Sequence, residues 1–120
     1  MGFATALLLM TLFCLPARSQ TIRPDQAKDY VNQNVRVCGA IDGYYLDTRS
    51  SKQPTFLDMG APYPDQPLVI VVWGDERSHF SYPLESLKGK SICVSGLVRL
   101  YRGKPEIVVS DEKQISLQTP

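Results

Sequence analysis

Hydrophobic and polar residues alternate along the chain between residues 34 and 111, and a period of two predicts a protein built from β-strands. In NVRVCGAIDGYYLD, residues 34–47, the side chains of Val35, Val37 and Ile41 fall on one face. The stretch LVIVVWG, residues 68–74, is apolar on both faces, so this strand should be the most buried one. The pattern predicts five strands, at residues 34–47, 55–60, 68–74, 91–101 and 105–111.

Two short helices are expected beside these strands. In TIRPDQAKDYVNQ, residues 21–33, Pro24 occupies a position that a first helical turn tolerates, and apolar residues follow at helical spacing. A second helix is predicted between the third and fourth strands, over Pro83 to Leu87, with Gly89 as its stop.

Five short strands, frequent glycine and a helix between strands three and four predict an all-β, five-stranded, OB-fold-like Greek-key barrel. Gly39, Gly43 and Gly96 can provide the bends that closure of the sheet requires. An SH3-type barrel is the alternative. The expected division is a signal peptide at 1–19, a helical lead-in at 20–33, the barrel at 34–115 and a flexible tail at 116–120.

The first segment has the pattern of an export signal. FATALLLMTLFCL, residues 3–15, is uncharged, and it is too short for a comfortable membrane span. Ala17 and Ser19 are the small residues that a signal peptidase reads, so cleavage is expected after Ser19. The protein is then periplasmic or secreted; an uncleaved membrane anchor is the alternative.

Charge and cysteine content narrow the function classes. Of the 13 Lys and Arg residues one, Arg18, lies in the signal, so the remainder balance the 12 Asp and Glu residues. This balance excludes a strongly basic nucleic-acid protein. Cys38 and Cys93 both lie opposite in phase to the inward valines of neighbouring strands, which predicts a structural disulfide on the outside of the barrel. His79 is the only histidine, which argues against a Cys/His zinc site.

Several motifs resemble those of a known fold family. VRVCGAI, then PTFLDMGAPYPDQPLVIVVWG and GKSICVSGLVRLYRGKPEIVVSD, resemble OB-fold nucleic-acid-binding domains of the tRNA-anticodon-binding-like type, as found in exported bacterial proteins. The resemblance covers residues 35–111. It implies the fold, and by analogy it implies nucleic-acid binding.

The hairpin tip LYRGKPE supplies the first candidate binding residues. In an OB-fold the loop between strands four and five flanks the binding surface. Arg99, Arg102 and Lys104 are candidates for phosphate contacts, and Tyr101 offers a ring on which a base can stack. The alternative is an ordinary turn in which Gly103 relaxes the backbone and the cations keep the tip soluble.

Aromatic residues on the first three strands supply the others. One of Tyr44 and Tyr45 must face the core; Tyr45 shares the phase of Val35 and Ile41, so Tyr44 is predicted to be exposed and ligand-binding. Phe56 and Trp73 lie on the usual binding strands. The pattern favours a core position for Phe56 and leaves Trp73 open.

These features favour a binding module over an enzyme. Asp42, Asp47 and Asp58 could be imagined as the metal ligands of a small nuclease, but they form no paired motif and no general base accompanies them. No cofactor or metal is expected. Single-stranded DNA or RNA is the leading ligand, a protein or glycan partner in the envelope is the alternative, and a metal-dependent nuclease is the third reading.

Overall fold

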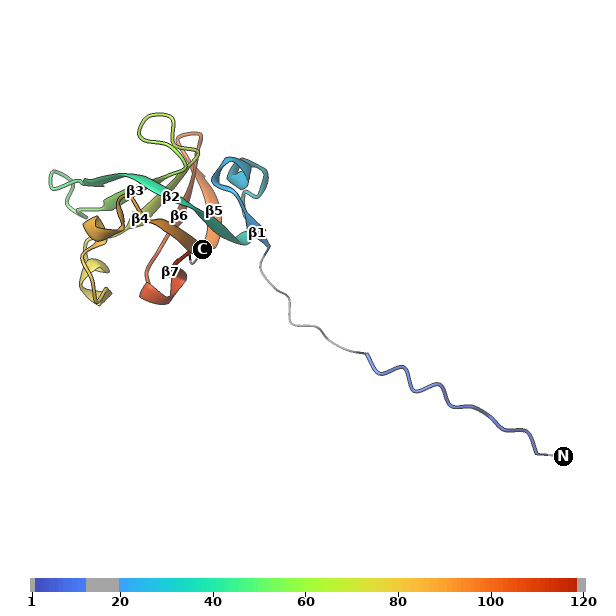
Figure 1. Cartoon of the computed structure of the whole chain (residues 1–120). Helices are drawn as coiled ribbons and strands as arrows, with labels where there is room; N and C mark the ends of the chain where they lie inside the picture. The colour runs from blue at the N-terminus through green and yellow to red at the C-terminus, as the bar shows by residue number, and fades with distance from the viewer. Residues whose placement is uncertain (1, 13–19, 119–120) are drawn as a thin grey trace.

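The computed structural model describes residues 2–12 and 20–118 and shows an all-β protein, as predicted (Figure 1). Residues 2–12 form no helix or strand. The described strands are β1 (Thr21–Ile22), β2 (Asn34–Leu46), β3 (Thr55–Met59), β4 (Leu68–Val72), β5 (Ser91–Tyr101), β6 (Lys104–Val108) and β7 (Ile115–Leu117).

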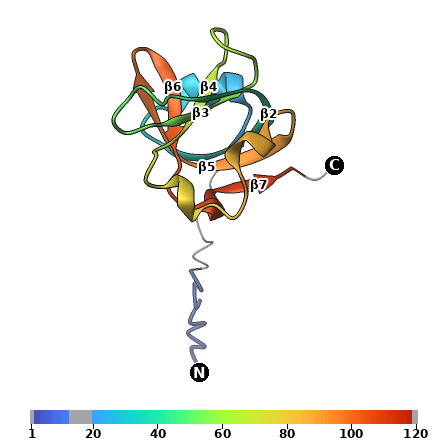
Figure 2. The same ribbon diagram turned by 90° about the vertical axis from the view of Figure 1, so that its left-hand side faces the viewer.

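Five of these strands pair in a closed ring, which Figure 2 shows nearly along its axis. β2 pairs antiparallel with β3, β3 with β4, β6 with β5, and β5 with β2, while β4 and β6 run parallel. The ring strands correspond to the five that alternation predicts. β1 and β7 extend the wall made by β2 and β5, one at each edge.

Inward-facing side chains from every ring strand fill the interior. Val37, Leu57, Ile70, Val94 and Ile107, one from each strand of the ring, are each 0% exposed. All five residues of β4 are buried, which confirms the expectation from its continuous apolar sequence. The core therefore follows the period-two pattern, and the remaining side chains face outward from the ring.

The predicted helices are present as short 3-10 turns. η1 (Pro24–Asp29) begins at the expected proline and buries Ala27 against the core. η3 (Leu84–Leu87) lies between β4 and β5 and buries both of its leucines, and η2 (Arg77–His79) precedes it. Segments this short hold few i→i+4 bonds, so the tighter 3-10 geometry is common in them.

The C-terminal end of the chain differs from expectation. Ser116 and Leu117, at the start of the segment predicted as a flexible tail, belong to β7, which pairs with β5 through Cys93 and Ser116. This strand follows η4 (Glu112–Gln114). The predicted cleavage site after Ser19 lies outside the described residues. In the part of the chain that is described, no helix is long and apolar enough to cross a membrane.

The predicted disulfide joins β2 to β5. Cys38 and Cys93 lie directly opposite each other in the register, and their Cα atoms are 4.0 Å apart. Val37 and Val94 beside them are fully buried in the barrel, so the bridge lies on the outside of this wall, as the sequence phase predicts.

Candidate functional site

The candidate site lies on the outer face, which is the set of outward-pointing side chains of β3, β4 and β6 and of the parts of β2 and β5 that pair with them. Strand register places Tyr45, Phe56, Val71 and Val108 in one line across this face. We call this line the aromatic row. The next line, two residues further along each strand, holds Asp58, Val69, Glu106 and Arg99.

Tyr45 and Phe56 form a pair of neighbouring rings in the aromatic row. Their centroids are 6.4 Å apart and their planes differ by 12°. Tyr45 is 56% exposed, and Phe56 is half-buried. The prediction that Phe56 lies in the core is therefore wrong. Its neighbour on the strand, Leu57, points inward instead and is fully buried.

Tyr44, predicted to be the exposed tyrosine, is half-buried and packs against the core. The cause is a β-bulge: the register with β3 shifts between Ile41 and Gly43. One extra residue in a strand exchanges its inward and outward faces beyond that point. The bulge therefore turns Tyr44 inward and Tyr45 outward. Gly43 was the sequence signal for it, since glycine inside a strand often marks a bulge.

Trp73, directly after β4, provides a further ring. The Lys52 ammonium lies over it, 5.5 Å from the ring centroid. Trp73 is half-buried and borders an open hollow. The hollow is lined by Ser51, Lys52, Gln53, Trp73, Gly74, Asp75 and Glu76. We call it the tryptophan hollow.

Backbone contacts fix the loop that carries Lys52. The Gly74 N–H donates to the Lys52 carbonyl oxygen at 2.9 Å, and Arg77 Nη2 donates to the Gln53 carbonyl oxygen at 2.6 Å. A Cβ atom on Gly74 would lie 2.6 Å from the Lys52 carbonyl oxygen, so only glycine permits this approach. At the start of the loop, Asp47 Oδ1 accepts the N–H groups of Arg49 and Ser50. No local sequence pattern predicts these contacts.

Residues 60–67, which we call the strap, cross the second line of the outer face. Gln66 Nε2 donates to Asp58 Oδ1 at 2.9 Å. Lys104 Nζ donates to Gln66 Oε1 and to the Pro64 carbonyl oxygen, both at 2.8 Å. Asp58 and Gln66 are almost fully buried beneath these contacts. Burial raises the pKa of the Asp58 carboxyl above its usual value, and the hydrogen bond from Gln66 and the Lys104 charge oppose that rise.

The other predicted cations, Arg99 and Arg102, differ in their partners. Arg99 Nε donates to Glu106 Oε1 at 2.7 Å, so this cation already has a carboxylate partner. Arg102 is exposed at the hairpin tip, with its guanidinium 5.2 Å from the ring centroid of Tyr101. Arg102 and Gly103 both have positive φ, as a two-residue hairpin turn requires.

The structure therefore divides the predicted binding residues into two groups. Phe56 lies in the aromatic row and Trp73 lies two residues after Val71 of that row; sequence reasoning missed Tyr45 and Lys52 beside them. Tyr101 and Lys104 pair with each other at the opposite end of β6, four residues from the row, or about 13 Å along an extended strand. The strap lies against Lys104 at this end of the face.

The aspartates considered as metal ligands have other partners or positions. Asp47 caps the loop after β2, Asp58 is bonded to Gln66, and Asp42 is exposed. Within residues 2–12 and 20–118, no group of three or more His, Cys, Asp or Glu side chains is arranged to hold a metal ion.

No family model matches the chain, and no curated protein matches it in sequence. Solved structures do match it. One chain of a crystal structure of yeast Stn1 and Ten1 aligns at 12% identity with a TM-score of 0.60, over 87% of this chain and 65% of that chain. A putative aspartyl-tRNA synthetase from Leishmania major Friedlin aligns at 10% identity with a TM-score of 0.51, over 90% of this chain and 22% of the synthetase.

A third structure, OBody AM1L10 bound to hen egg-white lysozyme, aligns at 10% identity with a TM-score of 0.54, over 88% of this chain and 100% of the OBody chain. This chain thus spans less than two thirds of the length of the first two chains that it matches. At these identities the likeness concerns the fold, which is OB-like.

Proposed function

We propose that this chain is an exported binding module that takes single-stranded nucleic acid on the outer face of its OB-like barrel. The aromatic row carries the proposal. Tyr45 and Phe56 lie side by side on adjacent strands, and Tyr45 leaves more than half of its surface in water. Bases stack on such rings with about 1–3 kcal/mol each and with little dependence on sequence. Trp73 and Lys52 add a ring and an ammonium close by.

Export is supported by two separate features. The uncharged run of residues 3–15 has the length of a signal-peptide core. The Cys38–Cys93 disulfide is of the kind that persists in oxidising compartments. We therefore place the mature protein in the periplasm or outside the cell.

In the proposed mode of binding, stacking contributes more than charge. Lys52 and Arg49 are exposed in the loop between β2 and β3, the strands that carry Tyr45 and Phe56, and we assign the phosphate contacts to them. Arg99 and Lys104 are bonded within the protein, so they add little. With about two phosphate contacts at about 0.7 each, the log–log dependence of affinity on salt should have a slope of about −1.4.

The test is fluorescence anisotropy of labelled single-stranded DNA and RNA with the mature chain at several salt concentrations. Tyr45→Ala and Phe56→Ala should each weaken binding by about 1–3 kcal/mol and leave the salt slope unchanged. Lys52→Gln should reduce the slope by about 0.7. Leu117→Ala and Lys90→Gln are the matched controls, because Leu117 is exposed on β7 and Lys90 lies beside it, away from β3 and β4. Full binding by the aromatic variants would reject the proposal.

We also propose that the module binds without cleaving its ligand. The same labelled strands, incubated with the protein and magnesium or manganese and run on a denaturing gel, should stay intact. Cleavage that is lost in Asp42→Ala or Asp47→Ala would instead favour the small nuclease.

A protein partner is the second candidate, and one observation favours it. Glu106 pairs with Arg99, and Gln66 and Pro64 bind Lys104, so much of the outer face has no free positive charge. The matching OBody, whose whole chain aligns with this one, is bound to hen egg-white lysozyme. Absence of nucleic-acid binding, together with capture of a protein that Tyr45→Ala abolishes, would select this alternative.

A further inference from the structure

We propose that the tryptophan hollow is a base-specific subsite that selects guanine, a preference that rests on the proposed binding of single strands. The hollow is lined by one aromatic residue, Trp73, and by two acidic residues, Asp75 and Glu76. The ring offers stacking to any base, whereas the carboxylates can discriminate among bases by hydrogen bonding.

Trp73, Asp75 and Glu76 lie together in one tight turn. The Glu76 N–H donates to the Trp73 carbonyl oxygen at 3.0 Å, which closes a four-residue turn. Gly74 within this turn is bonded to Lys52, so the turn and the loop facing it are fixed to each other. The two walls of the hollow are therefore organised before a ligand arrives.

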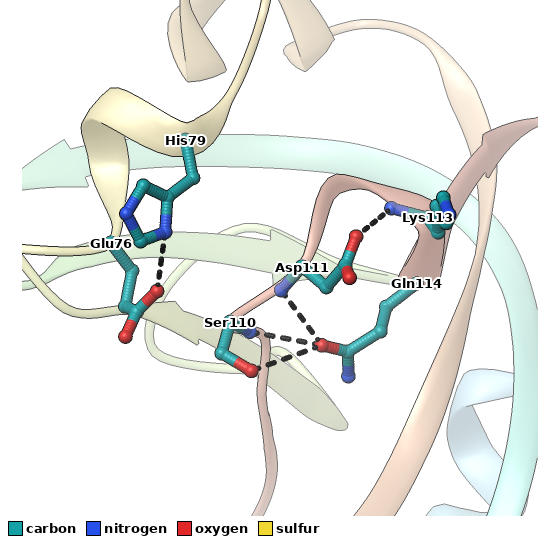
Figure 3. A network of polar contacts seen from close by, with 6 residues as sticks. All are labelled: Glu76, His79, Ser110, Asp111, Lys113 and Gln114. Atoms are coloured by element: carbon teal, nitrogen blue, oxygen red, sulfur yellow. Dashed lines mark hydrogen bonds and ion pairs between the residues drawn. The ribbon is translucent and has the colours of Figure 1, made fainter.

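The two carboxylates differ in whether they have a partner within the protein. Glu76 Oε2 lies 2.8 Å from His79 Nδ1, and Figure 3 shows the carboxylate turned toward that ring. Asp75 is exposed, and among the residues described its side chain takes part in no hydrogen bond or ion pair. His79 thus orients one carboxylate, and the other is available to a ligand.

The chemistry of the bases decides which one fits. An ionised carboxylate has two acceptor oxygens and no donor. Guanine presents two adjacent donors on its Watson–Crick edge, the N1–H and the 2-amino group. Adenine and cytosine each present an amino donor beside a ring-nitrogen acceptor, and uracil and thymine present one N–H between two carbonyl oxygens. Only guanine can give a carboxylate two parallel hydrogen bonds while its face lies on an aromatic ring.

Lys52 completes the subsite. Its ammonium over the Trp73 ring is a weak contact at an exposed position, so an arriving base can displace it. The displaced ammonium is then free to meet the phosphate of the same nucleotide. This phosphate contact would connect the nucleotide in the tryptophan hollow with the bases stacked on Tyr45 and Phe56.

The experiment measures anisotropy with short oligothymidylate strands that carry one central guanine, adenine, cytosine or hypoxanthine. The guanine strand should bind about tenfold more tightly than the adenine and cytosine strands. Hypoxanthine keeps the N1–H and lacks the 2-amino group, so it should fall between them. Asp75→Asn with Glu76→Gln should remove the preference for guanine, while the plain oligothymidylate still binds. Asp29→Asn, a control at an exposed acid on η1, should change neither the preference nor the binding of the plain strand.

Every outcome is informative. Equal affinity for all four strands, or a preference that survives Asp75→Asn with Glu76→Gln, overturns the guanine subsite and leaves the proposed function in place. Failure of every strand to bind overturns both. Trp73→Phe should keep the preference for guanine, because an aromatic ring remains. Trp73→Ala should weaken the binding of all strands by about fivefold or more. Loss of the preference in Trp73→Phe would mean that the groups that recognise guanine lie elsewhere.

Discussion

Loss of the Cys38–Cys93 bridge should lower the free energy of unfolding by about 4 kcal/mol. The bridge closes a loop with a sequence separation of 55 residues. The chain-entropy relation for a loop of this length gives a stabilisation of about 4 kcal/mol at room temperature, mainly by restricting the unfolded chain. For a domain of about 100 residues, this loss corresponds to a melting temperature lower by about 15–30 °C.

Urea unfolding of two altered proteins measures this effect. One is the wild-type chain reduced with a phosphine, and the other is the variant Cys38→Ala, Cys93→Ala. Cys93 is only 2% exposed, so the variant also loses packing and should be somewhat less stable than the reduced chain. Both should show a lower midpoint and a steeper dependence on urea, because an unfolded chain without the cross-link exposes more surface. Ser95→Ala, two residues along β5, serves as the control.

A loss of less than about 1 kcal/mol on reduction, with an unchanged dependence on urea, would contradict this prediction. That result would mean that the unfolded chain keeps β2 and β5 near each other without the bridge. Two free thiols in protein purified from the exported fraction would refute the bridge itself.

Three further predictions concern the outer face and its loops. Lys104→Ala should cost about 1–3 kcal/mol in urea unfolding, because Gln66 Oε1 and the Pro64 carbonyl oxygen lose their donor; Arg102→Ala, its exposed neighbour, should stay within about 0.5 kcal/mol of wild type. Burial raises the pKa of Asp58 above its ordinary 3.8, so the folded protein binds the proton more tightly than the unfolded chain. Wild-type stability should therefore fall, relative to Asp58→Asn, as pH rises from about 4 through the raised pKa; parallel pH profiles of the two proteins would contradict this. Gly74→Ala should cost about 1–3 kcal/mol, because its Cβ meets the Lys52 carbonyl oxygen, and an unchanged melting temperature would show that the loop can move aside.

Alternation predicts the strands well because burial acts on every second residue over their whole length. The fourth predicted strand, residues 91–101, has the bounds of β5. The same rule fails at Tyr44 and Tyr45, where the bulge between Ile41 and Gly43 inserts one residue and reverses the faces. Periodicity fixes faces only within an uninterrupted strand, so the reversal could be found only by treating Gly43 as a break.

The candidate binding residues are harder to predict because their partners are distant in sequence. The sequence pattern predicts that Lys104 is a free cation at a hairpin tip. In the structure it donates to Gln66 and Pro64, which lie 38 and 40 residues earlier in the chain. Lys52 and Trp73 are likewise brought together by tertiary structure alone. Local patterns identify which side chains can face outward, but the charges that remain available depend on contacts formed only in the fold.

Stacking on the aromatic rings sets most of the affinity that the proposed function implies. Three rings, those of Tyr45, Phe56 and Trp73, at a middle value of about 2 kcal/mol each, give about 6 kcal/mol, or a dissociation constant in the tens of micromolar. Arg99 and Lys104 add little to this sum because each is bonded within the protein. A titration that ends at nanomolar protein would therefore miss the interaction, and the assays must reach high micromolar concentrations. Nanomolar binding of a short strand would mean that Lys104 leaves the strap to meet a phosphate, and Lys104→Ala would then weaken binding and flatten its salt dependence.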